Sequence, residues 1–364
     1  MIALPEDQKI WVEWMRRSIQ LALLAEGRTS PNPLVGAIVL DSNGKLVGEG
    51  YHSGAGNPHA EIEALAQAGE KSLNGTIVVT LEPCCHQGLT PPCTGAIIKA
   101  GLKKVVIGMV DPDPRVSGKG ISRLKESGIE VIQGVLNQEC EFINREFSFR
   151  VRHGRPWGVL KWAMSLDGRI GLPNGSSKWI TNTPARDAVH QIRSKCDAII
   201  VGGGTVRFDN PLLTSRGKSK NEPLRVVFTR TLDLPKSSKL WDTKIAKTLI
   251  AYGPEGDEAF FSELPVGPDR LKLNSNDPSE LLASLSKKGC NRILWECGPE
   301  LATSAIAADC VQELIVFIAP KLLGGKSSMT ALNSFGFESI QSTYKLQHSF
   351  LERKEEDLCW RLLF

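Results

Sequence analysis

The chain of 364 residues has no apolar run long enough to cross a membrane. Its longest apolar stretch, ELIVFIAPKLL at 313–323, is interrupted by proline and lysine well short of the about 20 residues that a span requires. The first residues, MIALPEDQKIWVEW, carry acidic side chains where a signal peptide has a basic flank followed by an apolar core. We therefore expect neither a membrane protein nor a secreted one.

The sequence also has little of what nucleic-acid-binding proteins carry. The net charge is only +4, there are three tyrosines, and no run of lysine or arginine stands out. The strongest basic cluster, RGKSKNEPLR at 216–225, is more typical of a solvated loop than of a binding patch. We therefore expect a small-molecule substrate and no nucleic-acid partner.

The cysteines are not arranged for disulfides. The chain has nine, an odd number, and six stand singly in mostly apolar surroundings: Cys140, Cys196, Cys290, Cys297, Cys310 and Cys359. This pattern is typical of buried thiols in a reducing compartment and favours the cytoplasm. The other three lie in LEPCCHQGLTPPC, at 81–93, where a disulfide at Cys84 is not expected.

Length and composition predict two globular domains. The hydrophobic fraction of 41% and the charged fraction of 23% are typical of such proteins, and 364 residues can form two cores. We expect helices over 8–26, from His59 onward and over 95–100. DSNGK joins two apolar runs, at 35–40 and up to Tyr51, into a hairpin, and strands follow at 76–80 and 105–109. This alternation predicts a sheet with helices on both faces.

HGRPWG, at 153–158, is the best candidate for a domain boundary. We expect one domain at 1–152 and another at 153–364, with no internal repeat that links them. In the second domain, Thr183 can cap a helix over 184–194 whose first position is Pro184. The sequence thus indicates two different α/β domains. The strands expected in the second domain cover 159–165, 198–201, 224–228, 248–252 and 292–295.

The segment PHAEIEALAQAG places His59 and Glu61 in the first turn of a helix, where both side chains can project into one pocket. The imidazole of His59 and the thiolates of Cys84 and Cys93 would make a three-ligand zinc site. The fourth position stays open for water, and Glu61 is then the general acid/base. H-x-E followed by P-C and a second cysteine is the pattern of zinc deaminases, although eight residues separate the two cysteines here.

Two alternatives remain open for this motif. A closed structural zinc site would also use Cys85 or His86, and it would leave no room for water. In the other alternative, the loop holds no metal and its cysteines are simply buried.

Several longer motifs resemble a known family. PNPLVGAIV, GEGYHSGAGNPHAE, TLEPCCHQGLTPPC and MVDPDPRVSGKGISRL are similar to the deaminase half of the bifunctional riboflavin-biosynthesis proteins, which are diaminohydroxyphosphoribosylaminopyrimidine deaminases and 5-amino-6-(5-phosphoribosylamino)uracil reductases. KWAMSLDGRI, SKWIT, VGGGTVRFDNPLLTSR, LWECGPELA and IAPKLLGG resemble the reductase half, in the same order. The resemblance extends from about Trp11 to Phe364.

The resemblance implies a cytidine-deaminase-like α/β/α domain followed by a dihydrofolate-reductase-like α/β domain with a largely parallel sheet. It implies a single zinc ion per chain in the first domain and NADPH in the second. The implied substrate is 2,5-diamino-6-ribosylamino-4(3H)-pyrimidinone 5′-phosphate, whose ring amine is hydrolysed before its ribosyl group is reduced to ribityl. Asn32 and His52 would line the pyrimidine pocket. We also expect a homo-oligomer.

The sequence departs from the family at Leu89, where the family usually has lysine or arginine. A leucine offers neither charge nor a hydrogen bond to a substrate phosphate. Arg115 or Lys119 is a candidate for the missing cation.

The second half lacks the G-x-G-x-x-G fingerprint, so a standard dinucleotide fold is not indicated. It has two glycine-rich turns instead, VGGGTV and ECGPELATSAIAA, and the second leads into a helix whose free N–H groups can bind a pyrophosphate. By the resemblance, the cofactor positions are Ala163, Trp179, Thr205, Asp209, Arg230, Gly298, Pro299, Glu300, Leu301, Ala302, Thr303 and Ser304. The substrate positions are Lys161, Ser177, Arg193, Leu213, Arg216 and Glu296.

Four of these residues have a chemistry that suits a sugar phosphate. Arg193 and Arg216 can clamp a phosphate, and Glu296 or Asp209 can accept hydrogen bonds from ribose hydroxyls. The set therefore suits the implied substrate and cofactor.

Two further basic residues have alternatives. Lys161 is a candidate proton donor to the opened sugar, or else the partner of Asp167 in an ion pair. Arg230 is a candidate for binding the 2′-phosphate of NADPH, or else an ordinary surface arginine.

Three other interpretations stay open. A nucleoside or nucleic-acid zinc deaminase with an accessory domain would share the zinc motif, but it would need a basic or aromatic channel for a strand. A zinc-stabilised scaffold would make Glu61 incidental. Finally, only one half of the chain is active if the change at Leu89 has weakened the deaminase.

Overall fold

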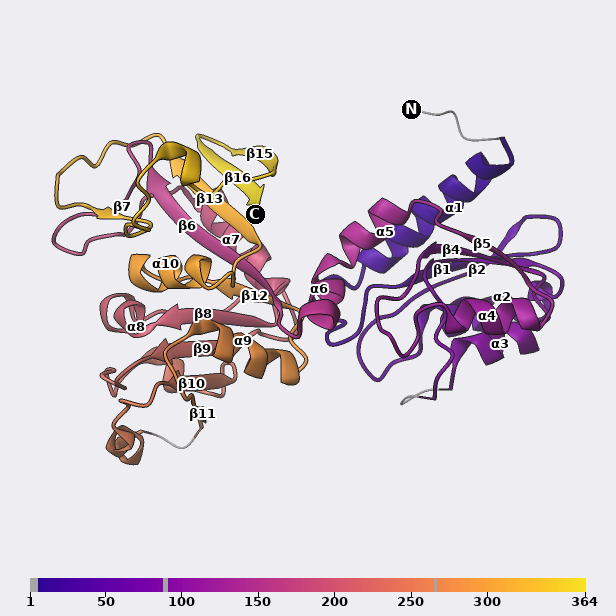
Figure 1. Cartoon of the computed structure of the whole chain (residues 1–364), viewed down its shortest axis with the longest axis horizontal. Helices are drawn as coiled ribbons and strands as arrows, with labels where there is room; N and C mark the ends of the chain where they lie inside the picture. Colours follow the sequence, from indigo (N-terminus) through magenta and orange to yellow (C-terminus); the bar gives the residue numbers. More distant parts are fainter. Residues whose placement is uncertain (1–5, 88–90, 265–266) are drawn as a thin grey trace. The chain divides into compact units, whose positions relative to one another are not determined.

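A computed structural model of the chain describes residues 6–87, 91–264 and 267–364 (Figure 1). The chain divides into two compact units, Met1–Gly154 and Arg155–Phe364. This division falls two residues after the boundary expected at 152. Each unit has its own sheet and its own hydrophobic core. No helix among the described residues is long and apolar enough to span a membrane.

The first unit is built on a five-stranded sheet of order β2-β1-β3-β4-β5. β1 pairs antiparallel with β2 and β3, whereas β3, β4 and β5 run parallel to one another. The central strands β1, β3 and β4 are almost wholly buried, which explains their continuous runs of apolar residues. The strands are β1 (Gly36–Leu40), β2 (Leu46–Tyr51), β3 (Thr76–Leu81), β4 (Lys104–Met109) and β5 (Glu130–Gln133).

Helices cover both faces of this sheet, as the sequence predicted (Figure 1). α1 and α5 contact each other on one face, and α2, α3 and α4 follow one another on the opposite face. The helices are α1 (Glu6–Leu23), α2 (Ala60–Ala68), η1 (Gly69–Ser72), α3 (Cys93–Lys99), α4 (Lys119–Glu126), α5 (Asn137–Ile143) and α6 (Arg145–His153).

Glycines in the hairpin let these helices approach the sheet closely. A Cβ atom at Gly36 would lie 2.0 Å from the carbonyl oxygen of Ser18 in α1, and one at Gly50 would lie 2.5 Å from that of Ala60 in α2. A larger side chain would push either helix away from the sheet. The tight packing of α2 on β2 therefore fixes the position of His59, which directly precedes α2.

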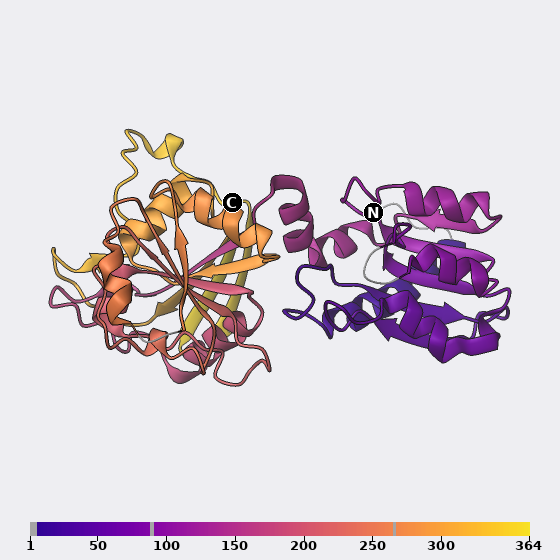
Figure 2. The ribbon, with the colours of Figure 1, turned by 90° about the horizontal axis from the view of Figure 1, so that it is seen from below.

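The second unit contains a nine-stranded sheet of order β11-β10-β9-β8-β12-β6-β13-β16-β15, seen obliquely in Figure 2. The strands from β11 to β13 are parallel, and β16 and β15 close one edge as an antiparallel hairpin. The strands are β6 (Trp157–Ser165), β8 (Ala198–Gly202), β9 (Leu224–Thr229), β10 (Thr248–Tyr252), β11 (Asp269–Lys272), β12 (Arg292–Trp295), β13 (Glu313–Ala319), β15 (His348–Lys354) and β16 (Asp357–Leu363), with a separate pair β7 (Arg169–Gly171) and β14 (Met329–Thr330).

Two hydrophobic clusters, one on each face, hold helices against this sheet. One cluster includes buried residues of α7, and the other includes buried residues of α9 and α10. The helices are α7 (Thr183–Ser194), α8 (Gly203–Asp209), η2 (Lys239–Trp241), η3 (Glu258–Glu263), α9 (Pro278–Lys287), α10 (Pro299–Ala307) and η4 (Ile340–Ser342).

One detail of the sequence prediction is wrong: the cap of α7 is Asn182, not Thr183. The Asn182 side chain accepts a hydrogen bond from the backbone N–H of Ala185 at 2.9 Å, and Thr183 is already helical. Asparagine is as good a cap as threonine, so the sequence alone did not separate the two. Pro184 lies in the first turn, as expected.

Candidate active sites

His59 stands at the start of α2, where its backbone is extended and its side chain makes no capping bond. The imidazole is directed instead at two sulfurs: its Nδ1 lies 3.2 Å from Sγ of Cys93 and 3.7 Å from Sγ of Cys84. Cys84 follows β3, and Cys93 is the first residue of α3. Three separate segments therefore converge on one point.

The three potential ligand atoms all lie within 4.8 Å of one another, and a zinc ion suits this donor set. The backbone N–H of Cys93 also points at Sγ of Cys84, at 3.3 Å, which favours a thiolate there. Within the described part of the chain, neither Cys85 nor His86 belongs to the cluster. The geometry therefore favours a three-ligand site over a closed four-ligand one. All nine cysteines are free.

The electrostatics of the cluster suit a cation. The hydrogen bond from the Cys93 thiol lowers the pKa of Cys84 to about 4, and the same contact raises the pKa of Cys93. The bond to Cys84 also raises the pKa of His59. A divalent cation held by these three side chains would take the place of protons on Cys93 and His59.

Glu61 lies two residues after His59 and is 3% exposed. Burial raises the pKa of its carboxyl group, and the negative charge of Cys84 raises it further. A carboxyl group that takes up a proton readily is what a proton shuttle needs.

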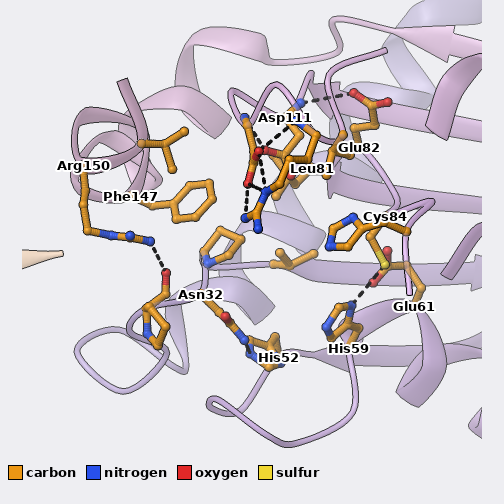
Figure 3. A pocket seen from close by; sticks show the side chains of 18 of the residues that line it. Asn32, His52, His59, Glu61, Leu81, Glu82, Cys84, Asp111, Phe147 and Arg150 are labelled. Carbon is orange, nitrogen blue, oxygen red and sulfur yellow. Dashed lines mark hydrogen bonds and ion pairs between the residues drawn. The ribbon is translucent and has the colours of Figure 1, made fainter. Parts of the chain in front are cut away.

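A cavity of about 380 Å³ adjoins this cluster (Figure 3). Asn32 and His52 both line it, and their side chains meet at 3.0 Å between Nδ2 and Nε2. The carbonyl oxygen of Pro58 can only accept, so Nδ1 of His52 carries the proton and Nε2 accepts from Asn32. Burial lowers the pKa of His52, which keeps the ring neutral.

The far walls of the cavity carry two arginines. Arg115 is held by Asp113, with Nε 2.9 Å from Oδ2. Arg150 donates from Nη2 to the carbonyl oxygen of Pro31 at 2.8 Å (Figure 3). Lys119, the first residue of α4, is not among the lining residues. Leu89 lies outside the described residues.

In the second unit, three charged side chains meet beside the paired parallel strands β6 and β12. Arg193 donates from Nε and Nη2 to the two carboxylate oxygens of Glu296, at 2.6 and 2.9 Å, and from Nη1 to the carbonyl oxygen of Thr214 at 3.1 Å. Nζ of Lys161 lies 3.8 Å from Oε2 of Glu296. Burial opposes the charge on Glu296, but Arg193 and Lys161 together hold its pKa at about 2.

The alternative in which Lys161 pairs with Asp167 is wrong. The Asp167 carboxylate accepts hydrogen bonds from the hydroxyl of Ser165 and from the backbone N–H groups of Leu323 and Gly324. Asp167 thus anchors the loop that follows β13.

The glycine-rich turns of this unit lie at the ends of neighbouring strands. Gly202 ends β8, and a Cβ atom there would lie 3.5 Å from a methyl carbon of Leu301 in α10. α8, with Thr205 and Asp209, and α10, which Gly298 precedes, therefore begin side by side. The other predicted cofactor residues of this segment are in α10: Pro299, Glu300, Ala302, Thr303 and Ser304.

Other predicted positions already have partners in the chain. Lys178 forms an ion pair with Asp209 at 3.6 Å, and the guanidinium of Arg186 lies 4.7 Å from the centroid of the exposed Trp179 ring. Arg230 follows β9 and pairs with Glu255 at 3.6 Å.

Four other predicted residues are characterised by the position or conformation of their backbone. Ala163 lies on β6 beside Phe317 of β13, and Ser177 lies in the segment between β7 and α7. Leu213 and Arg216 both have positive φ, of 53°.

Family matches cover most of the chain. The cytidine and deoxycytidylate deaminase zinc-binding region matches residues 9–109, and the RibD C-terminal domain matches residues 156–359. The riboflavin biosynthesis protein RibD of Synechocystis sp. is 47% identical over 333 residues, which cover 91% of this chain and 90% of that protein. The chain belongs to the RibD family.

Solved structures agree with this assignment. Acinetobacter baumannii RibD is 34% identical with a TM-score of 0.89, over 98% of this chain and 99% of that one. The diaminohydroxyphosphoribosylaminopyrimidine deaminase/5-amino-6-(5-phosphoribosylamino)uracil reductase of Thermotoga maritima is 33% identical with the same TM-score and the same coverage. The fold class is confirmed: a cytidine-deaminase-like unit precedes a RibD-type reductase unit. This RibD-family chain is a bifunctional deaminase and reductase of riboflavin biosynthesis.

Sequence reasoning missed several residues of the first site. Glu82 and Asp111 both line the cavity and are buried, and Phe147 and Arg150 reach it from α6. The motifs LEPCC and MVDPDPR contained Glu82 and Asp111, but nothing in their spacing pointed to a role. The residues of α6 had no sequence signal, because only the fold brings this helix to the cavity.

Proposed function

We propose that the first unit deaminates 2,5-diamino-6-ribosylamino-4(3H)-pyrimidinone 5′-phosphate by hydrolysis, and that the second unit then reduces the ribosyl group of the product to ribityl with NADPH. The observation that carries the first step is the cluster of His59, Cys84 and Cys93 beside the buried Glu61, at the wall of one cavity. The family assignment supports both steps.

The residues of the first site have distinct roles in this proposal. His59, Cys84 and Cys93 would hold a single zinc ion, which would supply a water that is nucleophilic at neutral pH. Glu61 takes a proton from the attacking water and gives it to the leaving ring amine, which departs as ammonia and leaves a carbonyl group. Asn32 and His52 hold the pyrimidine edge, because a neutral His52 with a fixed tautomer gives a defined hydrogen-bonding pattern.

The substrate phosphate needs a cation, and Leu89 cannot supply one. We assign this role to Arg115 and Arg150, which line the same cavity as His59 and Cys84. Arg115 was one of the two candidates from the sequence, and its pairing with Asp113 keeps the guanidinium in a defined place.

In the second unit, NADPH would supply a hydride. The N-terminus of α10, preceded by Gly298, suits the cofactor's pyrophosphate, and the cofactor positions Pro299 to Ser304 carried over from the family lie in this helix. Lys161, held next to Glu296, is positioned to give a proton to the oxygen of the opened sugar. Arg193 and Arg216 would bind the substrate phosphate, and Ser177 and Leu213 would contact the substrate by resemblance to the family.

The decisive experiment is to incubate the purified protein with the diamino substrate without NADPH, and to follow ammonia release and metal content together. Ammonia release with about one zinc per chain is the expected result. Addition of NADPH should then give the ribityl product with oxidation of the cofactor. Zinc without ammonia would contradict the deaminase proposal and leave only the reductase step.

The nine free cysteines also favour a cytoplasmic enzyme, and we propose that location. We further propose a homo-oligomer, which light scattering of the purified protein would test.

A further inference from the structure

Glu82 is a buried carboxylate that the deaminase chemistry does not use. It follows β3, immediately before the Pro83–Cys84 segment, and is 3% exposed. Its Oε1 accepts from the backbone N–H groups of Gly120 at 2.9 Å and Ile121 at 3.2 Å. Its Oε2 accepts from those of Gly118 at 2.9 Å and Asp111 at 3.3 Å.

Three of these donors belong to the N-terminal end of α4. Gly118 is the N-cap residue of α4, and Gly120 and Ile121 lie in its first turn. Such N–H groups have no partner within their own helix and normally need a nearby capping side chain. Gly118 has no side chain that could accept hydrogen bonds from these N–H groups, so the cap comes from Glu82, 36 residues earlier in the chain. The negative charge also suits the positive end of the helix.

The start of α4 and the segment after β3 also pack tightly against each other at Gly120 and Pro83. A Cβ atom at Gly120 would lie 2.2 Å from the carbonyl oxygen of Pro83 and 3.1 Å from Oε1 of Glu82. The start of α4 is therefore pressed against the segment that carries Cys84.

The two segments that Glu82 joins form different parts of the cavity wall (Figure 3). Cys84 lines the cavity from the segment after β3, and Asp111, Asp113 and Arg115 line it from the segment between β4 and α4. Loss of the hydrogen bonds that Glu82 accepts would move these two parts of the wall relative to each other.

We propose that Glu82 is a positioning residue for deamination, which fixes the wall that carries Asp111 to Arg115 relative to the metal-binding cysteine. The inference rests on the proposed deaminase function of this site. Glu82 lines the cavity, but both of its carboxylate oxygens are bound to backbone N–H groups, so in this proposal it acts through the segments that it holds and not on the substrate.

Glu82→Gln tests this. The variant keeps the shape of the side chain but turns an amide NH₂ group toward backbone N–H donors, so one side of the link is lost. We expect the KM for deamination to rise by about tenfold or more while kcat changes by less than about threefold, because the substrate wall moves but the zinc ligands and Glu61 remain. Zinc content should stay at one per chain, and the absorption of a cobalt-substituted protein should shift because Cys84 is held differently. NADPH oxidation by the same polypeptide with the deaminated substrate should be unchanged.

Gly120→Ala perturbs the same junction without changing Glu82 and should give the same KM increase. Glu126→Gln, on the exposed part of α4, is the matched control and should behave as the wild type. Wild-type KM and an unchanged cobalt spectrum in both junction variants would overturn the proposal. If the junction variants lost both their zinc and the cooperative melting transition of the first unit, the proposal would also be overturned, because Glu82 would then be only structural. Absence of ammonia release by the wild type would instead contradict the deaminase function, and the cobalt spectrum would still test Glu82.

Discussion

Arg193 and Glu296 form a two-pronged ion pair, with Nε 2.6 Å from Oε1 and Nη2 2.9 Å from Oε2. The pair joins α7 to the end of β12 and lies mostly out of solvent. The sequence assigned each residue to a ligand, Arg193 to a phosphate and Glu296 to a ribose hydroxyl. The structure shows that each forms hydrogen bonds with the other.

Glu296→Gln should make the second unit less stable and less sensitive to acid. The pKa of Glu296 is lowered to about 2, so its contribution to stability is present above the unfolded pKa of about 4.3 and is lost as pH falls toward 2. The acid-dependent part should be on the order of 3 kcal/mol in the wild type and should vanish in the variant. Denaturant unfolding between pH 7 and about pH 2 would measure it. Glu338→Gln, at an exposed position, is the control, and an equal acid sensitivity of wild type and Glu296→Gln would contradict the prediction.

Glu61→Gln should lower ammonia release by about 10²- to 10⁴-fold, because the proton shuttle is lost. Zinc content should stay the same, since the three ligands are untouched. Glu63→Gln lies on the exposed side of the same helix and should retain full activity. A Glu61→Gln protein with wild-type turnover would contradict the role of Glu61 as the proton shuttle.

Removal of zinc with a chelator should abolish ammonia release and leave NADPH oxidation with the deaminated substrate within about twofold of its starting value, since His59, Cys84 and Cys93 all lie in the first unit. Readdition of zinc should restore the first reaction. Parallel loss of both activities would show that the second reaction also depends on the metal.

Arg115→Ala and Arg150→Ala should each raise the deamination KM for the phosphorylated substrate by about tenfold or more, because each removes a cation from the cavity wall. The KM for the dephosphorylated nucleoside should change much less. Lys125→Ala, an exposed change on α4, controls for general loss of charge. Equal effects on both substrates would mean that these arginines only shape the cavity.

Arg225→Met should destabilise the second unit by about 3–5 kcal/mol, because loss of the buried guanidinium leaves several backbone carbonyl groups without a hydrogen-bond donor. Arg225 is fully buried, and Nη2 donates to the carbonyl oxygens of Leu240, Asp242 and Ala246 at 3.0, 2.8 and 2.7 Å. Lys288→Met, at an exposed position, is the control for loss of a cation. Thermal unfolding followed by the tryptophans would measure the difference.

Most elements of the fold could be predicted, because their apolar periodicity is strong. The buried strands β1, β3, β4 and β8 are short continuous apolar runs between clear turns, and each lies within a residue or two of its expected place. The zinc cluster could also be predicted, because its ligands belong to compact motifs.

The partners of charged residues could not be predicted. Asp167 is the acid nearest to Lys161 in the sequence, but the register of β6 beside β12 brings Lys161 to Glu296 instead. Likewise, Glu82 meets α4 only because β3 and β4 are neighbours in the sheet. Contacts of this kind depend on topology, which spacing along the chain does not contain.

His59 is the N-cap of α2, and Cys93 is the first residue of α3, so one ion would tie together the starts of two helices and the end of a strand. A ligand that binds only the folded state adds stability that grows with its free concentration. We therefore expect the persistence of the first unit in a cell to depend on the supply of free zinc. Under zinc starvation we expect proteases to attack the first unit first and to leave a reductase without a source of its substrate.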